Sequence, residues 1–238
     1  MANSTAPLWP YAPRETVSEN QPAVIAEGLT LHATPQAPSL IAPAAFSIQR
    51  QQHTALIGPN GSGKSTLLRT IAGLLPVTTG SLKVLGQAPR RGRSSIAYLS
   101  QSFQLTPNFP ISVEAFVATG TYSTLGWFRR PTASNPDVAA ALAQLGLQSL
   151  AQHRLETLSG GQLQRARLAR AFAQKAELLL LDEPFAGLDQ ESRELIEHFL
   201  FHEPHTLTIL MATHDSCDFG HCPQTLSLRH GQLEIHHA

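Results

Sequence analysis

Residues 58–65 have the sequence Gly58-Pro59-Asn60-Gly61-Ser62-Gly63-Lys64-Ser65, which follows a short apolar run and precedes a helical pattern. This order matches G-x-x-x-x-G-K-[ST], a loop that joins a strand to a helix and surrounds phosphate groups. Its glycines let the backbone approach closely, while successive N–H groups point at a bound phosphate. The motif therefore predicts a phosphate-binding loop within an α/β domain.

The same loop supplies positive charge and a metal ligand. A helix that begins near Gly63 adds about half a positive charge at its N-terminus, and Lys64 brings a full charge to the β- and γ-phosphates. The hydroxyl of Ser65 can bind Mg²⁺. We therefore predict that a nucleotide with Mg²⁺ binds here, in contact with Gly58, Pro59, Asn60, Gly61, Ser62, Gly63, Lys64, Ser65 and Thr66.

Two carboxylates follow the apolar run at residues 178–181. Asp182 and Glu183 would stand at the carboxyl end of a strand, where ligands of open parallel sheets collect. Neighbouring side chains on an extended chain point apart, so Asp182 can reach the Mg²⁺ shell while Glu183 polarises the attacking water. His214 follows the next apolar strand and can hydrogen-bond the transferring phosphoryl group. We predict catalytic roles for Glu183 and His214.

The remaining pattern predicts sheets around this loop and an insertion of helices. Short apolar runs at 23–32, 45–49 and 54–57 fit an antiparallel edge sheet, which the glycine-bounded strand at 80–86 joins. Residues 111–156 have a helical pattern and are the expected inserted subdomain.

Two further predictions concern the second half of the chain. The runs at 177–181 and 206–213 are apolar without alternation, which is not expected of a strand with one solvent-exposed face. They therefore predict buried parallel strands covered by helices. Apolar residues on either side of His230-Gly231 predict a terminal hairpin.

Composition limits the classes of function. The 238 residues include 17 Lys+Arg and 17 Asp+Glu, a balance that does not favour nucleic acid or acidic lipid as a partner. No apolar run approaches the roughly 20 residues that span a bilayer, so we expect membrane partners to do any membrane work. Residues 1–21 have no apolar secretory core and are expected to be a disordered leader that stays in the cytosol. Cys217 and Cys222 are expected to be free thiols.

A second helix start suited to an anion lies further along the chain. Ser159 is a natural N-cap for a helix in which Ala166, Ala169 and Ala173 recur at helical spacing. Two such helix starts exceed what one nucleotide needs at a single site. A head-to-tail homodimer would use both.

Taken in order, these motifs resemble the ATP-binding cassette (ABC) family, over about residues 23–231. The resemblance implies a P-loop NTPase fold of the α/β class: a RecA-like mixed sheet core, an antiparallel β subdomain and an inserted α-helical subdomain. The expected ABC ATPase domain covers residues 22–238, with the helical subdomain at about 103–172.

The resemblance also implies roles for particular residues. In the family, ATP is held between the phosphate loop of one subunit and the signature segment of the other. Asp189 would then lie at the dimer interface. Gln101 would be a further catalytic residue that binds Mg²⁺, together with Ser65 and Asp182, and couples the site to a membrane subunit. The signature that contacts ATP in trans would be Leu158, Ser159, Gly160, Gly161 and Gln162.

The segments at 120–131 and 184–189 resemble ATPases that serve zinc and manganese importers. The resemblance implies an ATP-hydrolysing subunit at the cytoplasmic face of the inner membrane. Its partners would be permease subunits and, indirectly, an extracytoplasmic binding protein. The alternatives are a soluble non-transport ABC-type ATPase, an ABC ATPase for another substrate such as an iron-siderophore, and a regulatory subunit without hydrolysis.

Two positions depart from the family pattern. Where the family stacks adenine on an aromatic residue, this chain offers only His32, which suggests weaker stacking. Gln51-Gln52 stands where the family has a glycine before the phosphate-loop strand. A metal site among the later histidines and cysteines is disfavoured, because their spacing lacks the tight pairs of zinc ligands.

Overall fold

The computed structural model describes residues 21–32, 39–90, 94–103, 110–122, 135–202, 206–214 and 222–237. Its strands are β1 (Val24–His32), β2 (Ser39–Ile48), β3 (His53–Ile57), β4 (Thr79–Val84), β5 (Ile96–Leu99), β6 (Leu178–Asp182), β7 (Thr208–Thr213), β8 (Gln224–Arg229) and β9 (Gln232–His237). Its α-helices are α1 (Lys64–Ile71), α2 (Val113–Ala118), α4 (Pro136–Gln144), α5 (Gly160–Ala173) and α6 (Gln190–Phe201), with short 3₁₀ turns η1 (Thr119–Thr121), η2 (Gln148–Leu150) and η3 (Leu155–Thr157).

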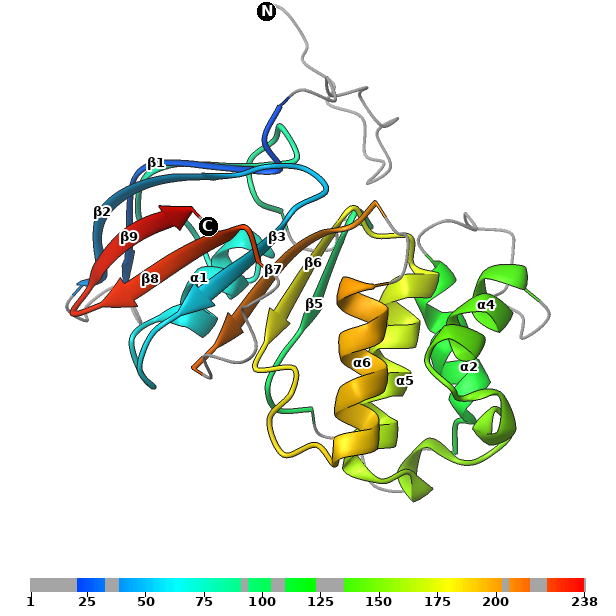
Figure 1. Ribbon diagram of the computed structural model, residues 1–238. Helices are drawn as coiled ribbons and strands as arrows, with labels where there is room; N and C mark the ends of the chain where they lie inside the picture. The colour runs from blue at the N-terminus through cyan, green and yellow to red at the C-terminus, as the bar shows by residue number, and fades with distance from the viewer. Residues whose placement is uncertain are drawn as a thin grey trace, which may run out of the picture.

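The large sheet has six strands in the order β5-β6-β7-β3-β8-β9 (Figure 1). Strands β5 to β8 in that order run parallel, and β9 runs antiparallel to β8. Every residue of β6 and β7 is buried, as the continuous apolar runs predicted. The terminal hairpin is also confirmed, because β8 and β9 pair around the His230-Gly231 turn.

The small sheet is antiparallel, in the order β2-β1-β4. This confirms the predicted pairing of the strands near 23–32, 45–49 and 80–86. The assignment of residues 54–57 to the same sheet was wrong. Strand β3 lies in the middle of the large sheet, between β7 and β8. Ala55 and Leu56 are both buried, on opposite faces of β3. A short strand that is buried on both faces shows no alternation of apolar and polar residues, so its sequence does not indicate which of the two sheets it joins.

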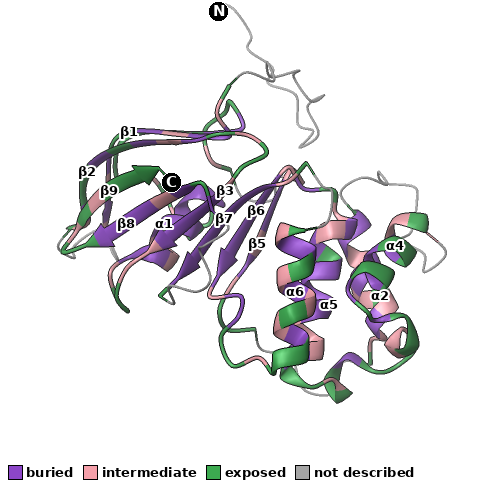
Figure 2. Ribbon diagram, viewed as in Figure 1, coloured by how far each residue is buried: buried purple, intermediate pink, exposed green. Residues whose placement is uncertain are grey.

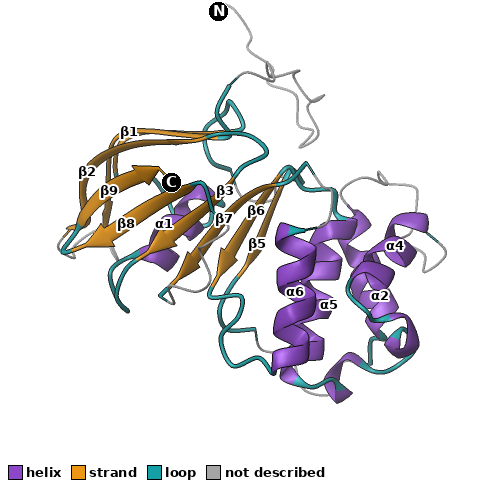
Figure 3. Cartoon of the chain, in the orientation of Figure 1, coloured by secondary structure: helices purple, strands orange, loops and turns teal. Residues whose placement is uncertain are grey.

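Alternate residues of the large sheet enter two different cores. Leu178 and Leu180 pack with the residues of α1 and the small sheet. Leu179 and Leu181 face the other way, toward α2, α4, α5 and α6. Figure 2 shows the central strands as buried and β9 as exposed, and Figure 3 shows the helical layer on one side of the sheet. Helix α1 is therefore placed at the opposite face from the other helices.

The predicted helical insertion contains α2, α4 and the 3₁₀ turns. Ser112 caps α2 by accepting a hydrogen bond from the Ala115 N–H, and Asn135 caps α4 in the same way. The subdomain limits at 103–172 stay a prediction, and most of the importer-like segment at 120–131 lies outside the described residues. So do residues 1–20 of the predicted leader and Cys217. Within the described part of the chain, Cys222 is a free buried thiol and no helix is long and apolar enough to cross a membrane.

Candidate nucleotide site

The predicted phosphate loop runs from the end of β3 to the start of α1, and its shape requires glycine. Gly61 and Gly63 have φ angles of 78° and 106°, in the left-handed region that other residues rarely adopt. A Cβ atom on Gly58 would collide with the carbonyl oxygen of Leu228 in β8. The loop is therefore pressed against the neighbouring strand and keeps its backbone exposed toward any ligand.

Lys64 is buried at the base of this loop, with 6% of its side chain exposed. Its Nζ donates hydrogen bonds to the carbonyl oxygens of Gly58 at 2.7 Å and Pro59 at 3.2 Å. The Oγ of Ser62 is buried and has no hydrogen-bond partner among the residues that the structure describes. A buried ammonium beside an unsatisfied hydroxyl suits a phosphate, which accepts hydrogen bonds from both. The loop thus fits the predicted nucleotide.

Ser65 and Asp182 come together from α1 and β6. The Ser65 hydroxyl donates to Oδ1 of Asp182 at 3.0 Å, and the carboxylate is only 3% exposed. Mg²⁺ prefers oxygen ligands, usually one or two protein carboxylates together with phosphate oxygens. The pair therefore fits the predicted metal position.

Tyr98 is a third member of this group that the sequence analysis missed. Its hydroxyl donates to Oδ2 of Asp182 at 3.2 Å. Burial raises the pKa of Tyr98, so the phenol keeps its proton at neutral pH. Hydrogen bonding to Tyr98 raises the pKa of Arg69, in the last turn of α1. No signal in the sequence points to this contact, because Tyr98 and Asp182 lie 84 positions apart.

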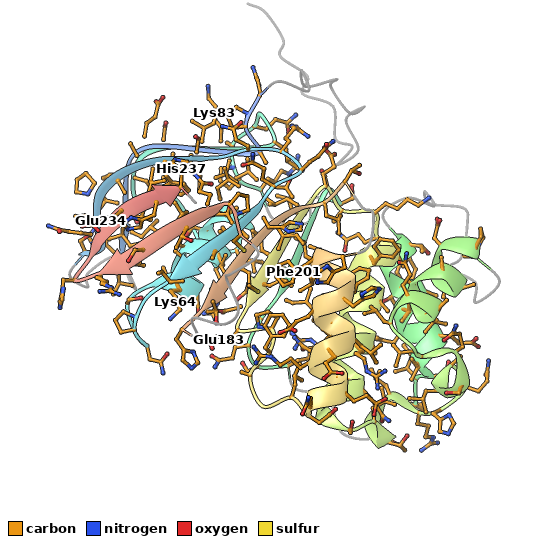
Figure 4. All side chains as sticks on the ribbon, in the orientation of Figure 1. Lys64, Lys83, Glu183, Phe201, Glu234 and His237 are labelled. Carbon is orange, nitrogen blue, oxygen red and sulfur yellow. The ribbon has the colours of Figure 1, made fainter. Side chains whose placement is uncertain are left out.

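Glu183 and His214 form a close pair at the carboxyl end of β6 and β7. Nδ1 of His214 lies 2.7 Å from Oε2 of Glu183, and Nζ of Lys64 lies 3.8 Å from Oε1. Figure 4 labels the side chains of Lys64 and Glu183. The Glu183 side chain is 7% exposed, whereas that of His214 is 57% exposed. Glu183 has a φ of 53°, a left-handed conformation that costs a non-glycine residue about 1–3 kcal/mol. This turn directs the carboxylate away from the line of β6.

Gln101 is exposed in the loop after β5, and among the described residues its side chain has no hydrogen bond to Ser65 or Asp182. Its Mg²⁺ contact stays a prediction. The residue before it is held by α5, because Arg167 Nη2 donates to the Ser100 carbonyl at 2.6 Å.

The predicted signature segment begins α5 as expected. Ser159 Oγ accepts from the Gln162 N–H, and the Gln162 side chain accepts from the Ser159 N–H, which is a capping box. Ser159 and Gly160 are exposed and Leu158 is half-buried. Gly161 is buried, and a Cβ atom there would collide with Asp189 and Ser192.

Asp189 is exposed beside this helix start. It caps α6, since its Oδ1 accepts a hydrogen bond from the Ser192 N–H at 2.8 Å, and this bond lowers the pKa of Asp189. Helices α5 and α6 both pack on the face of the large sheet opposite α1. The exposed tip of the signature is therefore separated by the sheet from the helix that follows the phosphate loop.

The sequence that forms this site matches a known protein family. Residues 41–186 match the family model described as ABC transporter. The chain belongs to the ABC transporter family. It is the ATP-binding subunit of such a transporter, an ATPase whose membrane permease partners the family implies.

Relatives of this ABC subunit serve metal transport. It is 40% identical over 195 residues to a Chlamydia pneumoniae protein named "Probable metal transport system ATP-binding protein", covering 81% of this chain and 80% of that protein. It is 43% identical over 148 residues, 62% of each chain, to the manganese transport system ATP-binding protein MntB of Listeria monocytogenes. A solved inward-facing metal-chelate-type ABC transporter aligns over 91% of this chain and 84% of its own, with a TM-score of 0.77 and 27% identity. The predicted resemblance to metal-ion transporters and the predicted fold class are confirmed.

The two departures from the ABC pattern have different outcomes. His32 ends β1, half-buried and paired with Ser39 of β2, and its contact with adenine stays a prediction. Gln51 has a φ of 57°, a left-handed conformation that favours glycine, and its N–H donates to Thr208 Oγ1 at 3.0 Å. A glutamine therefore makes a turn that glycine would make with less strain.

Proposed function

We propose that this ABC subunit hydrolyses ATP with Mg²⁺ to energise the import of a divalent metal ion, manganese or zinc. The names of the two relatives support metal transport. The phosphate loop, the Ser65–Asp182 pair and the Glu183–His214 pair supply groups that ATP hydrolysis needs. The transported ion would be cargo of the permease. No residue of the ATPase has to bind it.

The observation that carries the hydrolytic role is the buried carboxylate of Glu183 between the ammonium group of Lys64 and the imidazole of His214. Lys64 Nζ lies 3.8 Å from Oε1 and His214 Nδ1 lies 2.7 Å from Oε2. In this proposal Lys64 binds the β- and γ-phosphates, and Glu183 accepts a hydrogen bond from the attacking water. His214 fixes the orientation of the Glu183 carboxylate toward the attacking water, and it can donate a hydrogen bond to the γ-phosphate.

Ser65 and Asp182 would hold Mg²⁺, with Gln101 approaching once the site closes. The ion, when bound, neutralises charge that develops on the β- and γ-phosphate oxygens. Ser65 and Asp182 would hold the ion next to the phosphate loop, near Lys64 and the start of α1.

Two copies would pair head to tail, each completing the other's site. Exposure of Ser159 and Gly160 at the start of α5 supports this arrangement, because an exposed helix N-terminus attracts an anion such as a partner's γ-phosphate. Asp189, exposed beside them, would line the interface. The permease would contact the helical subdomain, proposed at 103–172 of an ABC domain covering 22–238, at the cytoplasmic face of the inner membrane. An extracytoplasmic binding protein would deliver the ion.

Uptake by intact cells tests the substrate. A strain that lacks this chain is expected to lose uptake of labelled manganese or zinc, and the intact chain is expected to restore it. The Lys64→Ala variant serves as the inactive control, because it removes the phosphate-binding charge. If the intact chain restores only iron-siderophore uptake, the transported substrate is an iron-siderophore and not manganese or zinc. Normal uptake of all three in the deletion strain would contradict a transport role in this class.

A further inference from the structure

Tyr98 lies on the same face of the large sheet as Asp182. In the parallel pair of β5 and β6, Tyr98 is opposite Leu180, and directly paired residues project to the same face. Asp182 follows Leu180 by two positions, so it shares that face as well. The face is the one covered by α1, because Leu180 belongs to the same core as Leu67 and Leu68.

The two oxygen atoms of the Asp182 carboxylate have different hydroxyl partners. Ser65 Oγ donates to Oδ1 at 3.0 Å, and Tyr98 Oη donates to Oδ2 at 3.2 Å. The carboxylate is 3% exposed, so water does not compete strongly for either oxygen. A carboxylate held at one oxygen can turn about its last bond. One held at both oxygens keeps its plane.

The Tyr98 hydroxyl is itself held from α1. The Arg69 side chain hydrogen-bonds to Tyr98. Because a guanidinium can only donate, it occupies a lone pair of the phenol and leaves the phenol proton for Asp182. The chain Arg69, Tyr98, Asp182 and Ser65 therefore begins and ends on α1, with β5 and β6 between.

We propose that Tyr98 is a positioning residue for the metal-binding carboxylate: its hydroxyl fixes the plane of Asp182 so that Oδ1 faces the Mg²⁺ position beside Ser65. This inference rests on the proposed Mg²⁺ dependence. Mg²⁺ requires close to ideal octahedral geometry, so a ligand free to rotate binds it less well. Removing a partner that orients a metal ligand typically lowers metal affinity about 10- to 100-fold.

The competing explanation is that Tyr98 only fills space, because its ring packs against the core around α1. The two explanations differ in what the hydroxyl does. Tyr98→Phe keeps the ring and removes only the hydroxyl. Tyr122→Phe is the matched control, since Tyr122 is 59% exposed after η1 and belongs to none of the motifs of the site.

The experiment measures binding of a fluorescent ATP analogue to the full chain, first in EDTA and then with increasing Mg²⁺. Tyr98→Phe is expected to bind the analogue in EDTA within about twofold of wild type, and to need about tenfold more Mg²⁺ for the metal-dependent increase. Tyr122→Phe should match wild type in both conditions. With Asp182→Asn in the background, Tyr98→Phe should have no further effect on the metal-dependent increase.

Each remaining outcome contradicts the inference. An unchanged Mg²⁺ titration for Tyr98→Phe means that the hydroxyl does not position Asp182. An equal loss of binding in EDTA and in Mg²⁺ means that the hydroxyl supports the folded site as a whole and does not act on the metal-binding carboxylate. If binding of the analogue to the wild-type chain does not depend on Mg²⁺, both the proposed Mg²⁺ dependence and this inference are wrong. If wild-type binding depends on Mg²⁺ and Tyr98→Phe has the same Mg²⁺ titration, only this inference is wrong.

Discussion

Oε2 of Glu183 lies 2.7 Å from Nδ1 of His214, although the two residues follow different strands. Strands β6 and β7 are adjacent and parallel, so their carboxyl ends meet at one edge of the sheet. The left-handed turn at Glu183, with a φ of 53°, then brings its carboxylate to the imidazole. Catalytic predictions for the two residues are therefore coupled.

Glu183→Gln is expected to bind ATP normally and to lose about 10²- to 10⁴-fold in turnover, because an amide cannot accept the proton of the attacking water. Steady-state phosphate release and equilibrium ATP binding measure the two effects. Glu234→Gln, an exposed carboxyl on β9, is the matched control and should keep wild-type turnover. Turnover within a few-fold of wild type in Glu183→Gln would remove Glu183 as the base.

His214→Ala is expected to lower turnover about 10²-fold or more, since the carboxylate of Glu183 loses the group that orients it. In a double-mutant cycle with Glu183→Gln, the two losses should be far from additive, because both residues act on the same water. His236→Ala removes an exposed imidazole on β9 and controls for loss of a histidine. Fully additive losses would mean that His214 acts independently of Glu183.

Alanine substitutions at Gly160 and Gly161 distinguish an effect on the proposed dimer contact from an effect on folding. A Cβ atom on Gly160 meets nothing within 4 Å in one protomer, whereas one on Gly161 collides with Asp189 and Ser192. Gly160→Ala should therefore leave the free energy of unfolding within about 0.5 kcal/mol of wild type and still block ATP-driven pairing. Gly161→Ala should also destabilise the monomer, by about 1–3 kcal/mol. Light scattering with Mg-ATP and urea unfolding are the measurements.

Pairing of Gly160→Ala with wild-type affinity would contradict the proposed trans contact. Equal stability of the two alanine variants would contradict the packing of Gly161 against the start of α6.

Gln51→Gly is expected to stabilise the chain by about 0.5–1 kcal/mol, because it relieves a left-handed conformation at a non-glycine residue. The backbone N–H that donates to Thr208 is kept in either variant. Gln52→Gly is the control, since Gln52 is not among the residues with positive φ and glycine there should destabilise. Urea unfolding of both variants, compared with wild type, decides the sign of each change.

Prediction from the sequence succeeded where each motif is a contiguous run with its own chemistry. Ser159 was predicted as an N-cap, and in the structure it caps α5 and forms a capping box with Gln162. The parallel strands at 178–182 and 208–213 were visible because burial on both faces requires continuous apolar residues. The placement of β3 failed, because so short a strand is compatible with either sheet and only the neighbours β7 and β8 decide between them.

By itself the sequence determined the phosphate loop, the paired carboxylates and the signature helix, since local geometry and residue chemistry are enough to specify each of them. Only the tertiary structure decided which of these groups touch. Glu183 meets His214 across 31 positions, Tyr98 meets Asp182 across 84, and Arg167 meets the Ser100 carbonyl across 67. Such contacts depend on the order and register of the strands and on how the helices pack on the sheet, and no short segment of the chain contains that information.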